Sequence, residues 1–199
     1  MPFEIVRNDI TNMQVDAIVN TANPKPIIGS GTDTMVHQKA GPQLLHARQK
    51  IGDIPRGGAA ITPAYDLDAK YVIHTVGPIY SISRSEECKK LLENCYKRSL
   101  ELAEEYGCKT VAFPLISAGV YGYPKKEALQ VAVDSIKLYE KNIDVKIILF
   151  DKDAWQIAKC AASVTLVVVS TAFAATKIVK IKKYIKEVSE NVVAVDANI

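Results

Sequence analysis

Metal-binding arrangements of cysteine and histidine are missing from this sequence. It has four cysteines and three histidines among 199 residues. None of them forms a CxxC pair or a histidine pair with the spacing of metal ligands, which argues against a zinc site. Cys88 and Cys95 lie in an amphipathic segment, where reduced thiols in a core are the more common role. We therefore expect neither a metal nor another cofactor.

An excess of charge of one sign is also missing. The chain has 25 lysines and arginines against 22 aspartates and glutamates, a net charge of +3, and most of this excess lies beyond Cys160. Such a balance does not provide the basic surface on which nucleic-acid binding depends. The first ten residues, MPFEIVRNDI, lack the long apolar run and basic flank of a signal peptide. We expect a cytoplasmic protein without a nucleic-acid partner.

Short β-branched runs alternate with longer helical patterns along the chain. Predicted strands cover 3–7, 16–20, 59–62, 71–76, 110–116 and 145–150. Predicted helices cover 32–39, 42–51, 86–106 and 124–141. Several strands are apolar nearly throughout, as strands covered on both faces must be. The pattern predicts an α/β sandwich with a largely parallel or mixed sheet, in which ligands bind at the carboxyl ends of the strands.

Two glycine-rich segments follow predicted strands and precede predicted helices. They are Asn20–Asp33 and Ser117–Gly122. Glycines in such loops allow backbone N–H groups to approach an anion, which a helix N-terminus also favours. No GxxxxGK[ST] motif is present, and GSGTDT lacks the last glycine of GxGxxG. Either loop alone could be an ordinary turn, but the two together indicate a diphosphate site.

Asp33 and His37 are four residues apart and therefore share one helix face. They could be a base and its neighbour in a catalytic site. Alternatively, Asp33 caps the helix and His37 is a core or surface imidazole. Asn20 and Asn23 likewise suit the turn after a strand. His74 lies in an apolar strand, where a core histidine with satisfied hydrogen bonds is expected.

Four motifs in order resemble the macro domain family, the ADP-ribose-binding α/β fold. They are VDAIVNTANP, IGSGTDTMVHQKAGP, AKYVIHTVGP and VAFPLISAGVYGYP. The chain is most similar to the MacroD-type ADP-ribosyl hydrolases and O-acetyl-ADP-ribose deacetylases. The resemblance implies a three-layer α/β/α macro domain over residues 1–160, with a central mixed, largely parallel sheet. Residues 161–199 form an extension that the resemblance does not cover.

The resemblance also implies a role for individual residues. Asp16 would accept a hydrogen bond from the adenine amino group, and Phe150 would stack on the adenine ring. Asn23 would hold the hydroxyls of the distal ribose beside Tyr121. The diphosphate would lie against backbone amides of Gly31, Thr32, Ser117, Gly119, Val120 and Tyr121. Ala17, Asn20 and Ala118 complete the implied ligand-binding set.

The implied activity is removal of ADP-ribose from modified Asp or Glu side chains, deacetylation of O-acetyl-ADP-ribose, or both. Asp33 would position a water, Asn23 would fix the ribose, and His37 would orient Asp33 or its loop. The implied partners are ADP-ribose or its esters and ADP-ribosylated proteins. The alternative is a non-catalytic ADP-ribose reader. Ser30 adds a hydroxyl where the family has a glycine run, which is expected to affect affinity and rate.

The region after the predicted domain has two alternative interpretations. Residues 160–176 carry no charge and are followed by the lysine-rich stretch KIVKIKKYIK. One interpretation is a packed element followed by an amphipathic helix with Ile178, Ile181, Ile185 and Val188 on one face. The other is a membrane anchor, which the number of hydroxyl residues and alanines disfavours.

Overall fold

The computed structural model describes residues 3–139 and 142–159, and within them a six-stranded sheet. The strands are β1 (Phe3–Val6), β2 (Val15–Thr21), β3 (Ala59–Pro63), β4 (Ala69–Thr75), β5 (Thr110–Pro114) and β6 (Asp144–Ile148). Their order is β1-β6-β5-β2-β4-β3. Every neighbouring pair is parallel except β3 and β4, which are antiparallel. The predicted mixed, largely parallel sheet is confirmed.

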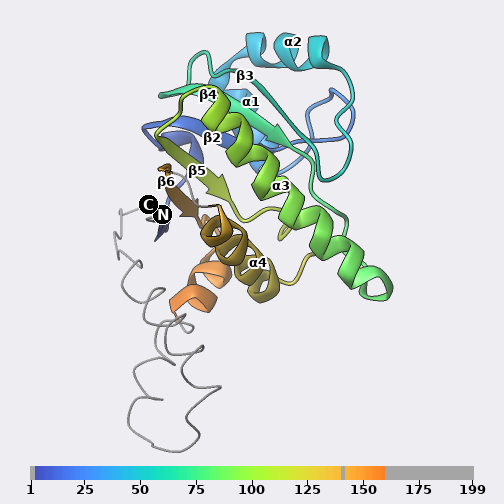
Figure 1. The fold of residues 1–199 in the computed structure, drawn as a ribbon. Coiled ribbons are helices and arrows are strands. Elements are labelled where there is room, and N and C mark those ends of the chain that lie inside the picture. The colour runs from blue at the N-terminus through green and yellow to red at the C-terminus, as the bar shows by residue number, and fades with distance from the viewer. Residues whose placement is uncertain (1–2, 140–141, 160–199) are drawn as a thin grey trace, which may run out of the picture.

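Helices cover both faces of this sheet (Figure 1). The α-helices are α1 (Thr32–Ala40), α2 (Pro42–Ile51), α3 (Ser85–Glu105) and α4 (Lys125–Leu138). Two short 3-10 helices are η1 (Ile10–Asn12) and η2 (Ile82–Arg84), and residues 152–159 are also helical. The α/β/α arrangement is the predicted one, while the 3-10 helices and the segment 152–159 are additional.

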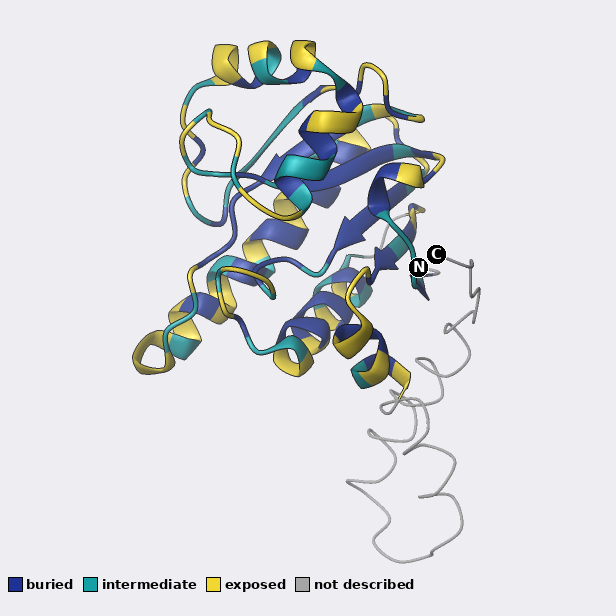
Figure 2. Cartoon of the chain, turned by 180° about the vertical axis from the view of Figure 1, so that it is seen from behind, coloured by how far each residue is buried: buried dark blue, intermediate teal, exposed yellow. Residues whose placement is uncertain are grey.

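The two faces of the sheet bury two separate hydrophobic clusters because successive side chains of a strand point to opposite sides. Val19 of β2 packs in the cluster that contains Leu92 of α3 and Ile136 of α4. Its neighbour Ile18 packs in the cluster that contains Leu44 of α2. Figure 2 shows the sheet and the inward faces of the helices as buried. The apolar runs of the sequence therefore form the middle layer of a sandwich.

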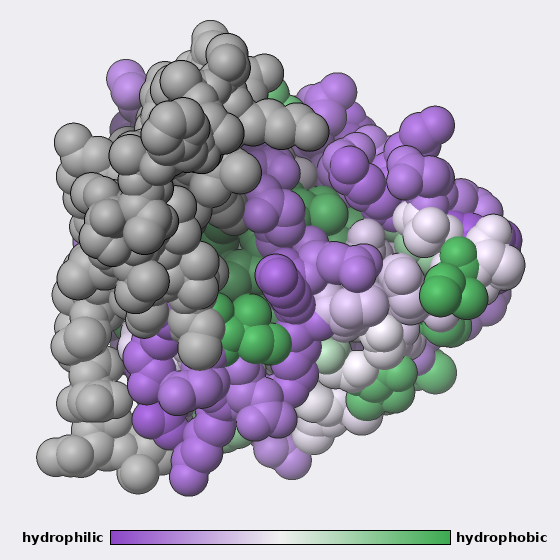
Figure 3. Space-filling view, turned by 90° about the horizontal axis from the view of Figure 1, so that it is seen from below, coloured by the Kyte–Doolittle hydropathy of each residue, from purple (hydrophilic) through white to green (hydrophobic). Residues whose placement is uncertain are grey.

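The carboxyl ends of the parallel strands lie on one side of the sheet, and the loops that follow these strands meet there. Strand β5 ends at Pro114 and β6 ends at Ile148, earlier than the sequence predicted, so that Leu115 and Phe150 belong to loops. Seen from below, the surface shows apolar areas as separate patches among hydrophilic ones (Figure 3). Exposed apolar side chains on the loops include Ile27, Ile79 and Val120.

The predicted extension at 161–199 and the possible anchor at 160–176 lie outside the described residues. Within the described ranges, none of the helices combines the length and hydropathy that a membrane crossing requires.

Candidate functional site

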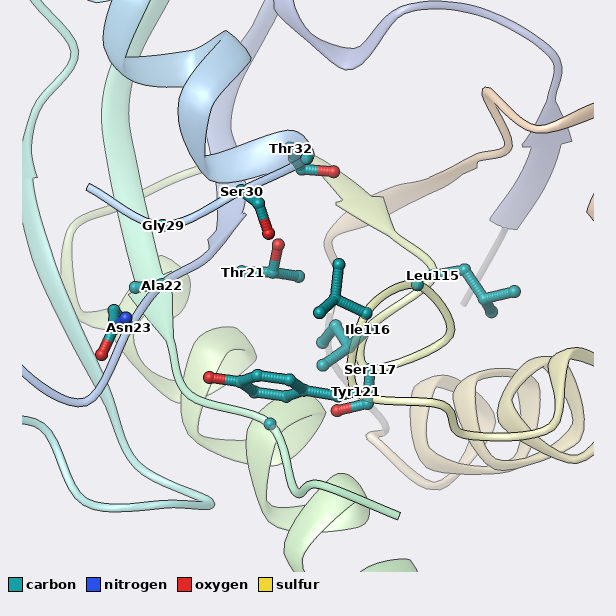
Figure 4. A pocket seen from close by; sticks show the side chains of 14 residues that line it. Thr21, Ala22, Asn23, Gly29, Ser30, Thr32, Leu115, Ile116, Ser117 and Tyr121 are labelled. Atoms are coloured by element: carbon teal, nitrogen blue, oxygen red, sulfur yellow. The ribbon is translucent and has the colours of Figure 1, made fainter.

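A cavity of about 400 Å³ opens at the carboxyl ends of the strands. Three loops line it. The loop after β2 contributes Asn23 and residues 29–32, the segment after β4 contributes Gly77, and the loop after β5 contributes residues 115–117 and 119–121. Figure 4 shows Ser30 and Thr21 with their hydroxyl groups turned toward each other inside the cavity, and the ring of Tyr121 across its other side. The wall at Gly77 was not predicted from the sequence.

A second cavity of about 260 Å³ adjoins the first. Gly31, Thr32, Leu115 and Gly119 line both. The second cavity is otherwise bounded by Asp9 and Ile10 after β1, Ala118, Lys125, and Phe150 after β6. Because the two cavities share a wall, they form one elongated cleft with an apolar aromatic end and a more polar end. We refer to them as the first and second cavities of this cleft.

The cleft is lined by residues of a helix N-terminus and by residues with unpaired backbone N–H groups. Gly31, with φ of 65°, precedes helix α1, and no side chain caps the helix. In the loop after β5, Ala118, Gly122 and Tyr123 donate to carbonyls of Leu115, Gly119 and Ser117. Within the described part of the chain, the amides of Gly119, Val120 and Tyr121 donate to no acceptor. Unpaired amides beside a helix N-terminus form an anion-binding concavity.

Ser117 supports this loop in an unusual backbone conformation. Its φ of 63° lies in the left-handed region that non-glycine residues rarely occupy. Its hydroxyl packs against Gly77, where the Cβ of any larger residue would come within 2.1 Å of Oγ. The Ser117 hydroxyl is buried and has no hydrogen-bond partner among the described residues. Residues 77 and 117 therefore fit together only because residue 77 lacks a side chain.

Behind the first cavity lies a buried polar network centred on Asp33. Asn20 Nδ2 donates to Asp33 Oδ1 at 2.6 Å, and Gly29 N donates to Asp33 Oδ2 at 2.5 Å. His37 Nε2 lies 3.5 Å from Asp33 Oδ1. Asp33 is only 1% exposed, and none of Asp33, His37 and Asn20 lines either cavity. The carboxylate thus connects strand β2 to the loop rather than facing the cleft.

His74 extends the network into strand β4. Its Nδ1 lies 3.3 Å from Asn20 Nδ2, and its Nε2 lies 3.0 Å from Thr62 Oγ1. Since the Asn20 nitrogen is a donor, Nδ1 is the acceptor and Nε2 carries the proton. Burial lowers the pKa of His74 to about 3, and the nearby Arg48 and His37 contribute to the same shift. The prediction of a buried histidine with satisfied hydrogen bonds is confirmed.

Arg48 of helix α2 fixes the backbone beside Asn23. The residue is 2% exposed, and its guanidinium donates to the carbonyl oxygens of Asn23 at 3.1 Å, of Pro24 at 3.3 Å, and of Gly52. These contacts anchor the loop after β2 to a helix. Arg48 was not among the residues predicted from the sequence.

The structure places most of the predicted ligand-binding residues along the cleft. Asn23, Gly31, Thr32, Ser117, Gly119, Val120 and Tyr121 line the first cavity, and Ala118 and Phe150 line the second. Asn20 is behind the wall, and Ala17 is fully buried within β2. For Asn20 and Ala17, the structure does not support a direct ligand contact.

The predicted contact of Asp16 with the adenine amino group is wrong. It lies at the start of β2, at the opposite end of the strand from the cleft. Its carboxylate accepts from the amides of Lys109 and Thr110 and pairs with Lys70 at 2.7 Å. The hydrogen bond from Lys70 and the backbone amides lower the pKa of Asp16 to about 2. Asp16 therefore stabilises the sheet at the amino ends of its parallel strands and does not reach the second cavity.

The carboxylate at the aromatic end of the cleft is instead Asp9. It lines the second cavity together with Phe150. Oδ1 of Asp9 accepts from the nitrogen and the hydroxyl of Thr11 at 2.8 Å, and no described residue donates to Oδ2. The sequence contained a signal for this residue, since Asp9 closely follows the first predicted strand. The described residues contain no group of three or more His, Cys, Asp or Glu side chains that could hold a metal ion.

A parallel sheet with free amides and glycine loops at its carboxyl edge is the architecture of α/β proteins that bind phosphate-containing ligands. The Macro domain model matches residues 19–132, more than half of the chain. The chain therefore belongs to the macro domain family, as its motifs predicted.

Relatives of known sequence support this assignment. An O-acetyl-ADP-ribose deacetylase of Enterobacter cloacae is 50% identical over 141 residues, which cover 69% of this chain and 78% of that protein. A macro domain-containing protein of Methanosarcina mazei is 43% identical over 165 residues, covering 81% of this chain and 88% of that protein.

Solved structures show the same fold. The Oceanobacillus iheyensis macrodomain with ADP is 34% identical, with a TM-score of 0.77 over 85% of this chain and 93% of that chain. The Trypanosoma brucei macrodomain in complex with ADP-ribose is 33% identical, with a TM-score of 0.72 over 79% of this chain and 68% of that chain.

Proposed function

We propose that the cleft binds ADP-ribose and that the protein hydrolyses ADP-ribosyl esters. The observation that carries this proposal is the pair of joined cavities, lined where they meet by the N-terminus of α1 and by Gly119, the first of three consecutive residues with free backbone amides. ADP-ribose has a matching sequence of groups: an aromatic base, a diphosphate and a second ribose. The complexes of related macrodomains with ADP and ADP-ribose support the same assignment.

In this proposal the adenosine end occupies the second cavity. Phe150 is 59% exposed, and its ring offers a face on which adenine stacks, an interaction worth about 1–3 kcal/mol per base. Oδ2 of Asp9 accepts from the adenine amino group. The diphosphate then crosses the wall at Gly31, Thr32 and Gly119, where amides and the N-terminus of α1 stabilise negative charge.

The distal ribose occupies the first cavity between Asn23 and Tyr121. Hydrolysis adds one water across the ester link and yields ADP-ribose and the free carboxylic acid, which loses its proton at neutral pH. The substrate class is O-acetyl-ADP-ribose and ADP-ribosyl esters of Asp or Glu side chains. The 50% identity to a protein named as an O-acetyl-ADP-ribose deacetylase supports this chemistry.

Burial changes the role that we assign to Asp33. Both its oxygens already accept hydrogen bonds, from Asn20 and Gly29, so we do not assign it direct contact with the attacking water. Asp33 instead positions the Gly29 loop against the ribose. The water is held by groups that reach the cavity, namely the side chain of Asn23 and the diphosphate of the substrate itself.

The alternative is a non-catalytic reader of ADP-ribose. The burial of the acidic residue and the exposed Ser30 at the cavity wall favour this alternative. The experiment is to measure ADP-ribose binding by calorimetry and, on the same preparation, the release of ADP-ribose from O-acetyl-ADP-ribose and from a glutamyl-ADP-ribosylated peptide. Binding with turnover supports the enzyme, binding without turnover supports the reader, and no binding at millimolar ligand rejects both.

A further inference from the structure

Arg56 links two parts of the first cavity that are far apart in the sequence. Its guanidinium Nη1 donates to the carbonyl oxygen of Gly77 at 2.8 Å. Its Cζ lies 5.1 Å from the centroid of the Tyr121 ring. Gly77 and Tyr121 both line the first cavity, whereas Arg56 does not. Arg56 therefore contacts the wall from outside.

The backbone of Arg56 is held firmly enough to direct its side chain. The following residue, Gly57, donates to the carbonyl of Val76 at 2.8 Å, and Val76 N donates back to Gly58 O at 3.2 Å. Gly57 has φ of 79°, and a Cβ at this position would meet Leu91 at 3.0 Å. The turn before β3 is thus fastened to the end of β4, one residue before Gly77.

The segment after β4 also holds the backbone of Tyr121. Tyr80 N donates to the carbonyl of Tyr121 at 2.9 Å. The main chain of Tyr121 is therefore hydrogen-bonded to Tyr80. Its ring contacts Arg56, which in turn donates to Gly77. The adjacent Val120 is 81% exposed. Arg56 thus adds a contact to the Tyr121 ring, next to an exposed position of the loop.

We propose that Arg56 is a positioning residue for the distal ribose, acting through Tyr121. The proposal rests on the proposed binding of ADP-ribose in this cleft. A cation over an aromatic face is attracted by the negative charge of the π system. This attraction keeps the Tyr121 ring in its position in the first cavity, which Asn23 also lines. Without it, the ring gains rotamer freedom that binding of the ribose must remove again.

The first test compares ADP with ADP-ribose, because ADP lacks the distal ribose. Arg56→Met keeps a side chain of similar length and removes the cation and the hydrogen bond to Gly77. We expect its ADP-ribose affinity to fall about three- to tenfold, the scale of one partly exposed cation–π contact, while its ADP affinity changes less than about twofold. Arg98→Met, which removes an exposed arginine paired with Glu101 on α3, is the matched control and should change neither affinity.

A double-mutant cycle then tests whether Arg56 acts through Tyr121. In a Tyr121→Leu background, Arg56→Met should have no further effect on ADP-ribose affinity. Melting temperatures of all variants show that they fold, and Arg56→Lys, which retains a cation, should lose less affinity than Arg56→Met.

Three results would overturn the inference. The first is an equal loss of ADP and ADP-ribose affinity in Arg56→Met, which indicates a general effect on the cleft. The second is unchanged ADP-ribose affinity. The third is a full effect of Arg56→Met in the Tyr121→Leu background, which indicates direct contact of Arg56 with the ligand. A wild-type protein that binds neither ligand would instead reject the proposed function, and with it the ribose role of Arg56.

Discussion

The amide nitrogen of Asn20 lies 2.6 Å from Oδ1 of Asp33, and both side chains are buried. The same nitrogen lies 3.3 Å from His74 Nδ1, and the other Asp33 oxygen accepts from Gly29. A continuous chain of hydrogen bonds therefore runs from the middle of the sheet to the loop that forms one wall of the first cavity. The geometry of this loop depends on groups that the ligand does not touch.

Replacing Asp33 tests whether the residue positions the loop or contacts water. Asn in its place has one acceptor oxygen for two donors, so that its own NH₂ group faces Asn20 or Gly29. We expect Asp33→Asn to lower the free energy of unfolding by about 1–3 kcal/mol, the cost of an unsatisfied buried group, and to weaken ADP-ribose binding as well as ester turnover.

Chemical denaturation, calorimetry and ester hydrolysis on one preparation measure these effects. Asp134→Asn, on the outer face of α4, is the control. Full stability and affinity with turnover reduced by roughly 100-fold or more, the scale of a lost general base, would show instead that Asp33 acts on the water.

The buried imidazoles predict that stability falls on acidification. Burial lowers the pKa of His74 to about 3 and outweighs Asp33 in lowering the pKa of His37. An unfolded histidine binds a proton below a pH of about 6.5, whereas the folded His74 stays neutral down to a pH of about 3. Stability is therefore full above the unfolded pKa and decreases as the pH falls below it, by roughly 1.4 kcal/mol per pH unit for His74.

Urea denaturation between about pH 7 and pH 5, a range that brackets the unfolded histidine pKa, measures this slope. Gln at position 74 can accept from Asn20 and donate to Thr62 without binding a proton, so His74→Gln should flatten the dependence. The same substitution at the exposed His46 of α2 is the control. An identical slope in wild type and His74→Gln would contradict the prediction.

Asp9 and Asp16 lie at opposite ends of the parallel strands, and replacing them should affect ligand affinity and stability separately. Asp9→Asn should weaken ADP-ribose binding by about 1.5–3 kcal/mol, the scale of a hydrogen bond to a charged group, with little loss of stability. Asp16→Asn should lower the free energy of unfolding, because it loses the ion pair with Lys70 and offers only a neutral oxygen to the amides of Lys109 and Thr110, and should leave affinity unchanged. Calorimetry measures the affinity of both variants, and chemical denaturation measures their stability. A loss of affinity in Asp16→Asn would show that Asp16, and not Asp9, contacts the adenine.

Whether a residue precedes or follows a strand explains which parts of the site could be predicted from the sequence. The glycine loops after β2 and β5 were predictable because each follows an apolar run, and parallel strands bring such loops to one edge. Asp16 was misassigned although it precedes the apolar run of β2 and therefore lies at the other edge. Asp9 follows β1 and satisfies the same rule that identified the loops.

The buried contacts could not be predicted in this way. The distance of Asp33 from the cleft depends on how the segment around Gly29 folds over the carboxylate, which no local pattern encodes. Arg48 and Arg56 resemble ordinary surface residues in the sequence, the first within a helix and the second in a turn. Only the packing of α2 and of the turn before β3 brings them to the loops of the cleft.

Arg48 provides the most direct test of this dependence on buried contacts. Arg48→Met fills a similar volume but leaves the carbonyls of Asn23, Pro24 and Gly52 without their guanidinium donor. We expect the free energy of unfolding to fall by about 3 kcal/mol, since three half-buried carbonyls lose a charged donor at once. Pro24 retains a hydrogen bond from Ile54 N at 3.0 Å, so the larger displacement should occur at Asn23. ADP-ribose affinity, measured by calorimetry at a temperature where the variant is folded, should therefore fall as well.

Arg98→Met on the exposed face of α3 controls for the lost charge. An Arg48→Met variant with wild-type stability and affinity would show that the loop holds Asn23 without Arg48.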